Sequence, residues 1–185
     1  DSFNQDTRWA IGHGGPNGNA LLGDVNGDGR ADAVVYDSAS GSWFVARSNG
    51  SQFVNPELWA QGHGVGSDQQ FLGDIDNDGR KDAIVYWQNW DAGTWYAAQS
   101  LGTEFDRFYR WHYLHGGAGF GQSAVNRLRY SQTQMLADIN GDCNASNAET
   151  AVAYFADEGS WRSLPAGVPG DSKYYLSSPE YNSWQ

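Results

Sequence analysis

Two nearly identical acidic segments decide how this sequence is interpreted: DVNGDGRAD at residues 24–32 and DIDNDGRKD at residues 74–82. Each segment has oxygen-bearing side chains at its first, third, fifth and ninth positions, and a glycine, Gly29 or Gly79, at its sixth. A glycine at that position permits the sharp turn that lets alternating acids converge on one point. Each segment is therefore predicted to form a loop that surrounds a cation.

The crowding of carboxylates favours a bound metal over a bare acidic turn. Carboxylates a few ångströms apart repel one another by roughly 4 kcal/mol per close pair at intermediate dielectric. An all-oxygen ligand set from a flexible loop favours calcium over zinc and magnesium. An EF-hand loop needs an acid at its twelfth position and flanking helices, but Val35 and Val85 stand there in strand-like runs. We therefore predict calcium (Ca2+) in both loops.

A third acidic segment, DINGDCN at residues 138–144, departs from this pattern. Cys143 replaces the turn glycine, and Ser146 stands where the closing acid would be, although Glu149 follows shortly afterwards. A third calcium site and an empty turn are both consistent with this sequence. The candidate ligands of this loop are Asp138, Asn140 and Asp142.

The acidic loops belong to a unit that recurs three times. A tryptophan precedes a histidine by four residues at Trp9, Trp59 and Trp111, and each unit continues with an acidic loop, an apolar run and a further tryptophan. β-branched and aromatic runs separated by Gly, Asn, Asp and Ser indicate about four strands per unit. In the first unit these strands are expected near residues 19–23, 32–37, 42–48 and 56–60. Such a repeat is typical of a propeller blade.

We therefore predict an all-β fold of three propeller-type blades, each with four antiparallel strands. A propeller ring closes with about 4–8 blades, so the ring is expected to be incomplete within one chain. A longer protein, or strands from another copy in a homo-oligomer, would then cover the open edges. The predicted parts are an outer strand at 1–11, blades at 12–60, 61–112 and 113–170, and an aromatic tail, a candidate exchanged strand, at 171–185.

The two complete loops, each followed by AVVY or AIVY and then a tryptophan-bearing strand, resemble FG-GAP/VCBS-type repeats. That family includes the propeller of integrin α subunits, certain fungal lectins and many secreted bacterial proteins. The resemblance extends over nearly all of residues 8–165 and implies a calcium site between the first two strands of a blade. The implied ligands are Asp24, Asn26, Asp28, the Arg30 carbonyl and Asp32, and Asp74, Asp76, Asp78, the Arg80 carbonyl and Asp82.

Composition narrows the classes of partner and location. Twenty-two acids against 11 Lys and Arg give a net charge of −11, which disfavours nucleic acid and anionic membranes. No apolar run approaches the ~20 residues of a membrane span. The chain starts at Asp1, as a processed secreted protein would, and Asn49 and Asn144 lie in glycosylation triplets, so a secreted or cell-surface location is expected. The single cysteine, Cys143, is either a buried thiol or a link to another subunit.

Other candidate binding residues lie in the insertion of the third unit, within residues 116–134. It contains Arg127, Arg129 and Tyr130, and inserted loops often lie on the binding face of such folds. A solvated loop or a subunit contact is the alternative. The repeated tryptophans, including Trp59, and the repeated histidines are predicted to be core anchors and hydrogen-bonding plugs. Their alternative role is to line sugar pockets.

The sequence does not favour catalysis. The clustered carboxylates are assigned to metal, and no nucleophile or phosphate-binding motif occurs, so we expect no enzyme activity. The leading hypothesis is a calcium-stabilised binding or adhesion module that recognises glycan or an extracellular protein. One alternative is a structural subunit of an extracellular fibre or oligomer assembled by strand exchange. Another is an accessory region of a polysaccharide-degrading enzyme.

Overall fold

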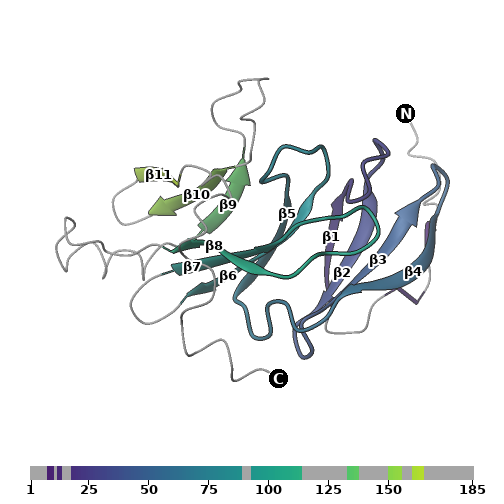
Figure 1. The fold of residues 1–185 in the computed structure, drawn as a ribbon, viewed down its shortest axis with the longest axis horizontal. Coiled ribbons are helices and arrows are strands. Elements are labelled where there is room, and N and C mark those ends of the chain that lie inside the picture. The colour runs from purple at the N-terminus through teal and green to yellow at the C-terminus, as the bar shows by residue number, and fades with distance from the viewer. Residues whose placement is uncertain are drawn as a thin grey trace, which may run out of the picture.

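The structure is a computed structural model that describes residues 8–10, 12–13, 18–88, 93–113, 133–137, 150–155 and 160–164. The regular elements in these ranges are all β-strands, and they form three antiparallel sheets (Figure 1). This confirms the all-β prediction. The described residues include no helix long and apolar enough to cross a membrane.

Consecutive strands pair with one another in each sheet. The first sheet contains β1 (Gly18–Gly23), β2 (Asp32–Asp37), β3 (Ser42–Ser48) and β4 (Phe53–Ala60). The second sheet contains β5 (Gln69–Gly73), β6 (Asp82–Gln88), β7 (Gly93–Ala98) and β8 (Tyr109–Tyr113). The third sheet contains β9 (Thr133–Ala137), β10 (Thr150–Phe155) and β11 (Ser160–Leu164).

The last strand of the first sheet begins at Phe53, earlier than the sequence indicated. The pairing of β3 with β4 shifts between Val45 and Arg47, which marks a bulge. Asn55 has a φ of 50° there, and Pro56 has no N–H to donate to the ladder. The strand therefore continues through an Asn-Pro pair that the sequence alone suggests as a break.

The first strands of the three sheets lie side by side. Strand β1 contacts β5, and β5 contacts β9, as Figure 1 also shows. Residues 24–32, here called the first loop, connect β1 to β2, and residues 74–82, the second loop, connect β5 to β6. The two predicted metal loops are therefore equivalent turns of neighbouring sheets.

Aromatic and aliphatic side chains fill the spaces between the sheets. Trp43 and Trp95, the tryptophans that follow the apolar run in each of the first two units, are fully buried. The cluster between the first and second sheets consists of Val25, Val34, Tyr36, Trp43, Val45, Trp59, Ala83, Val85, Ala98 and Phe105. The other cluster consists of Ile75, Ile84, Tyr86, Trp95 and Ala97, with Phe71 and Leu136 packed against it. Leu136 belongs to β9, so the second sheet is packed on both faces.

A buried histidine links the first sheet to the second. The His63 ring lies between the rings of Trp43 and Phe108, at centroid distances of 5.6 and 5.4 Å. Its Nε2 atom donates to the Ala83 carbonyl at 3.1 Å, and His13 makes the same bond to the Ala33 carbonyl, also at 3.1 Å. The prediction that the repeated histidines are hydrogen-bonding plugs is confirmed at both positions.

Candidate metal centre

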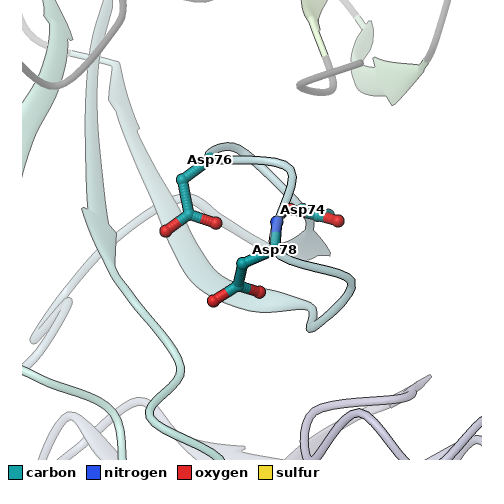
Figure 2. Close-up of side chains that lie close together, drawn as sticks. All are labelled: Asp74, Asp76 and Asp78. Atoms are coloured by element: carbon teal, nitrogen blue, oxygen red, sulfur yellow. Dashed lines mark hydrogen bonds between the residues drawn. The ribbon is translucent and has the colours of Figure 1, made fainter. Parts of the chain in front are cut away.

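The second loop brings three carboxylates together. Oxygens of Asp74, Asp76 and Asp78, one from each residue, all lie within 4.8 Å of one another (Figure 2). The carboxylate of Asp74 accepts hydrogen bonds from the backbone N–H of Asp78 at 3.1 Å and of Gly79 at 2.9 Å. Gly79 has a φ of 88°, which L side chains rarely adopt. The glycine turn predicted from the sequence thus places the first, third and fifth acids around one point.

Asp76 carries a buried oxygen that has no hydrogen-bond partner. Its Oδ2 atom accepts a 2.6 Å hydrogen bond from Gln99 Nε2, but its Oδ1 atom has no partner among the described residues. Burial, followed by the charges of Asp78 and Asp74, raises the pKa of Asp76, although the nearby Asp78 N–H and the Arg80 charge lower it. A buried acceptor without a donor costs roughly 1–3 kcal/mol. These features fit a cation in the second loop better than an acidic turn alone.

The ninth-position acids, Asp32 and Asp82, are fully buried and fasten each loop to its sheet. Asp82 accepts from the backbone N–H of Ile75 at 3.0 Å and of Ser100 at 2.8 Å. Asp32 makes the equivalent pair with Val25 at 3.3 Å and Ser48 at 2.8 Å. Burial raises the pKa of both carboxyls, that of Asp82 to about 7, although these N–H groups lower it. Their predicted role as metal ligands stays a prediction.

Side-chain oxygens of the first loop already accept hydrogen bonds from backbone N–H groups of the same loop. The Asp24 carboxylate accepts from the backbone N–H of Gly27 at 2.7 Å and of Gly29 at 2.6 Å. The Asn26 side-chain oxygen accepts from the Asp28 N–H at 2.9 Å. Within the described ranges, the only close group of three acids is the one in the second loop. A bound cation would therefore stabilise the first loop less than the second.

An arginine neutralises part of the charge in each loop. The Arg30 guanidinium lies 2.5 Å from the Asp28 carboxylate, and Arg80 pairs in the same way with Asp78. Burial raises the pKa of Asp28, but the Arg30 backbone N–H, Asn26 and the Arg30 charge together outweigh burial and lower it. The arginines were predicted to contribute carbonyl oxygens, and that role stays a prediction. Their side chains add a positive charge that the sequence prediction did not consider.

The structure leaves several predicted site residues untested and places one in the core. The third-loop candidates Asp138, Asn140 and Asp142 and the insertion candidates Arg127, Arg129 and Tyr130 lie outside the described residues. Trp59 is 3% exposed, and its ring lies edge-on to Phe105 at 5.3 Å. A buried indole has no free face on which a sugar could stack, so this placement fits the core-anchor interpretation and not a sugar pocket.

Two residues after β7 contact the loops and were not predicted. Gln99 donates to Asp76, and the Ser100 hydroxyl donates to the Val25 carbonyl of the first loop at 2.5 Å. One signal for Ser100 was present in the sequence. Ser48 and Ser100 occupy the same repeat position, and each is followed two residues later by a glycine. Gln99 has no counterpart of this kind, because the equivalent position in the first unit is Arg47.

Comparisons with known proteins support a repeat of the expected type. Residues 24–85 match the FG-GAP-like repeat family, which confirms the resemblance over both complete loops. A solved lectin from Agrocybe aegerita, studied for its specific recognition of non-reducing terminal N-acetylglucosamine, has a similar fold with a TM-score of 0.52 and 16% identity. The likeness covers 82% of this chain and 39% of the lectin, so the chain spans about two fifths of the lectin's length. No curated protein sequence matches this chain at a significant level.

Proposed function

We propose that this chain, whose residues 24–85 carry the FG-GAP-like repeat, is a secreted, calcium-stabilised, propeller-type module that binds glycan or protein and has no catalytic activity of its own. The repeat and the lectin-like fold support a binding module. Solvent-exposed loops of this kind suit extracellular calcium, because modules outside cells bind it with Kd of about 0.1–1 mM.

The partnerless Asp76 Oδ1 atom is the observation that carries the calcium proposal. In the second loop, the cation would be held by Asp74, Asp76 and Asp78, with the Arg80 carbonyl and Asp82 as the remaining predicted ligands. Calcium would neutralise the crowded carboxylates and fix the turn between β5 and β6. Since the unfolded chain has no such site, binding free energy becomes folding free energy.

Calcium titration tests this proposal. We expect calorimetry to detect binding, and calcium at one hundred times its Kd to stabilise the fold by about 2.7 kcal/mol per site, visible as a higher Tm. Asp76→Asn should reduce the contribution of the second loop to this effect, because it replaces one of its charged ligands by an amide. Glu57→Gln removes one carboxylate from an exposed pair with Arg47, far from either loop in sequence, and should behave as wild type. A Tm that does not change on chelation would contradict the proposal.

The glycan proposal draws on the lectin, whose study concerns terminal N-acetylglucosamine. Arg127, Arg129 and Tyr130 are the candidate ligand residues of this chain. On a glycan array that includes terminal N-acetylglucosamine, we expect a signal that Arg129→Ala removes. Trp59→Phe should retain the signal, because Trp59 is a core residue. An array without signal for the calcium-loaded protein would contradict glycan recognition.

Assembly with a second copy of the chain is the second candidate function, and the first sheet favours it. Leu22 and Leu58 lie on the face of this sheet that points away from the second sheet, and they are 67% and 51% exposed. The equivalent residue of the second sheet, Leu72, packs into the core between the sheets. Leucines that are exposed on a face whose equivalent is covered in the next sheet are suited to contact another copy of the chain.

A further inference from the structure

We infer that the two loops bind calcium in a fixed order, the second loop first, and that its occupation tightens binding in the first loop through direct contact between them. This inference rests on the proposed calcium binding. It follows from a difference between the two ligand sets and from hydrogen bonds that join the loops.

The second loop gains more from a cation than the first. It has carboxylates at its first, third and fifth positions, whereas the first loop has an amide, Asn26, at its third. Affinity for calcium increases with the number of charged ligands. Asp76 Oδ1 is buried without a partner, but the Asn26 oxygen already accepts a hydrogen bond from Asp28. The second loop is therefore expected to be the tighter site.

Gln99 positions Asp76 by a hydrogen bond, and the first loop has no equivalent glutamine. The pairing of Val35 with Phe44 matches that of Val85 with Tyr96, which makes Arg47 the equivalent of Gln99. Arg47 instead pairs with Glu57 at 3.1 Å. Because Gln99 holds Oδ2 at 2.6 Å, the other oxygen of Asp76 is fixed in place before a cation arrives.

The backbone of the first loop accepts hydrogen bonds from the second loop and from the residue that follows β7 by two. The Lys81 N–H donates to the Asp24 carbonyl at 2.7 Å, and the Ser100 hydroxyl donates to the Val25 carbonyl at 2.5 Å. A Cβ atom at Gly27 would lie 3.2 Å from Arg80 Cγ. Two carbonyls of the first loop are thus hydrogen-bonded to residues in or next to the second loop and β7, and Gly27 lies close to the Arg80 side chain.

The same residues of the second sheet are held by the acids of the second loop. The Ser100 N–H donates to Asp82 at 2.8 Å, and Arg80 Nε donates to the Ser100 carbonyl at 2.9 Å. The Arg80 N–H in turn donates to Asp78 at 2.9 Å. A cation that fixes Asp78 and Asp82 therefore also fixes Ser100, and with it the first loop. By linkage, occupation of the first loop tightens the second by the same factor.

Nuclear magnetic resonance can follow each loop separately. The Gly29 and Gly79 N–H groups donate to the first acid of their own loops, at 2.6 and 2.9 Å, so each amide signal reports one site. In a calcium titration of the 15N-labelled chain, we expect the Gly79 signal to reach its midpoint at lower calcium than the Gly29 signal. The reverse order would overturn the inference.

Two variants test the contact between the loops. Asp76→Asn weakens the second site and should move the Gly29 midpoint to about tenfold higher calcium, within the usual range of coupling. Ser100→Ala removes the hydroxyl bond to Val25, keeps all proposed ligands, and should also raise the Gly29 midpoint. Ser48→Ala is the matched control. Its N–H bond to Asp32 repeats that of Ser100 to Asp82, and among the described residues its hydroxyl meets only Gly50.

The outcomes separate this inference from the proposed function. Equal midpoints for Gly29 and Gly79 would overturn the fixed order of binding, and a Gly29 midpoint that neither Asp76→Asn nor Ser100→Ala changes would overturn the coupling. Either result leaves calcium binding intact. A Ser48→Ala shift as large as that of Ser100→Ala would also overturn it. If neither amide responds to calcium at all, the calcium proposal itself fails.

Discussion

His63 illustrates how burial changes a titratable side chain at the joint between two sheets. The residue is 1% exposed, and its Nδ1 atom has no partner among the described residues. Burial lowers the pKa of His63 to about 4, although the bond to the Ala83 carbonyl raises it slightly. The folded protein therefore keeps this imidazole neutral at a pH where the unfolded chain protonates it.

The contribution of His63 to the stability of the protein should consequently be lost in acid. The folded pKa of His63 lies below the ordinary value of 6.5, so its contribution to the free energy of unfolding falls as pH drops from about 6.5 to about 4 and levels off below. The raised pKa of Asp82 acts in the opposite direction over part of this range, so the His63 contribution is obtained by comparison with a variant. The total loss from this residue is on the order of 3 kcal/mol. Urea denaturation at several pH values, at fixed calcium, measures it. His63→Phe fills the space between Trp43 and Phe108 without titrating and should lose less stability than the wild type as pH falls from about 6.5 to about 4; an equal dependence on pH would contradict this role.

At the scale of the element, the first loop is built both by its own turn and by the sheet beside it. Gly27 and Gly29 have φ angles of 80° and 82°, so both require the left-handed conformation that glycine adopts readily. They differ in their surroundings. A side chain at Gly27 would meet Arg80, whereas no atom lies within 4 Å of a Cβ atom at Gly29.

Alanine substitutions should separate these two requirements. Gly29→Ala is expected to lower the free energy of unfolding by about 1 kcal/mol through backbone strain. Gly27→Ala should cost roughly 1 kcal/mol more, because its methyl group also displaces Arg80 from the joint between the sheets. Chemical denaturation in chelator, which removes any difference in calcium affinity, compares the two. Equal losses would show that the contact with Arg80 contributes little.

At the scale of the whole molecule, the first and second sheets do not have equivalent surroundings. The second sheet is covered on both faces, but the first sheet leaves Leu22 and Leu58 exposed on one. Burial of apolar surface yields roughly 25 cal/mol per Å². A second copy that covers this face would therefore gain from the same physical effect that joins the sheets within the chain.

Sedimentation tests this assembly. We expect the wild-type chain to form dimers at micromolar concentration and Leu22→Lys to shift it toward monomer, because a buried ammonium group opposes association. Leu101→Lys is the control, since Leu101 is 52% exposed but lies in the segment between β7 and β8 and not in the first sheet. A wild-type chain that is monomeric throughout this range, or equal effects of both substitutions, would contradict the proposal.

The sequence by itself determined the loops, the strands and the histidine plugs. Alternating acids and the glycine at the sixth position act within nine residues, so the turn of the second loop follows from local geometry. The β-branched and aromatic runs between Gly, Asn, Asp and Ser likewise indicated the strands of the first sheet. The earlier start of β4 also has a local cause. A bulge at Asn55 and Pro56 lets the strand continue through an Asn-Pro pair, which usually ends a strand.

Only the tertiary structure decided which residues support these loops. Gln99 meets Asp76 across 23 residues, and Ser100 meets Val25 across 75. The tertiary structure also places Trp59 in the core, whereas the sequence was consistent with either core packing or sugar binding. Contacts between sheets depend on how distant segments pack against one another, and neighbouring residues in the sequence carry no signal of that packing. The acids were therefore predictable, and the donors that hold them were not.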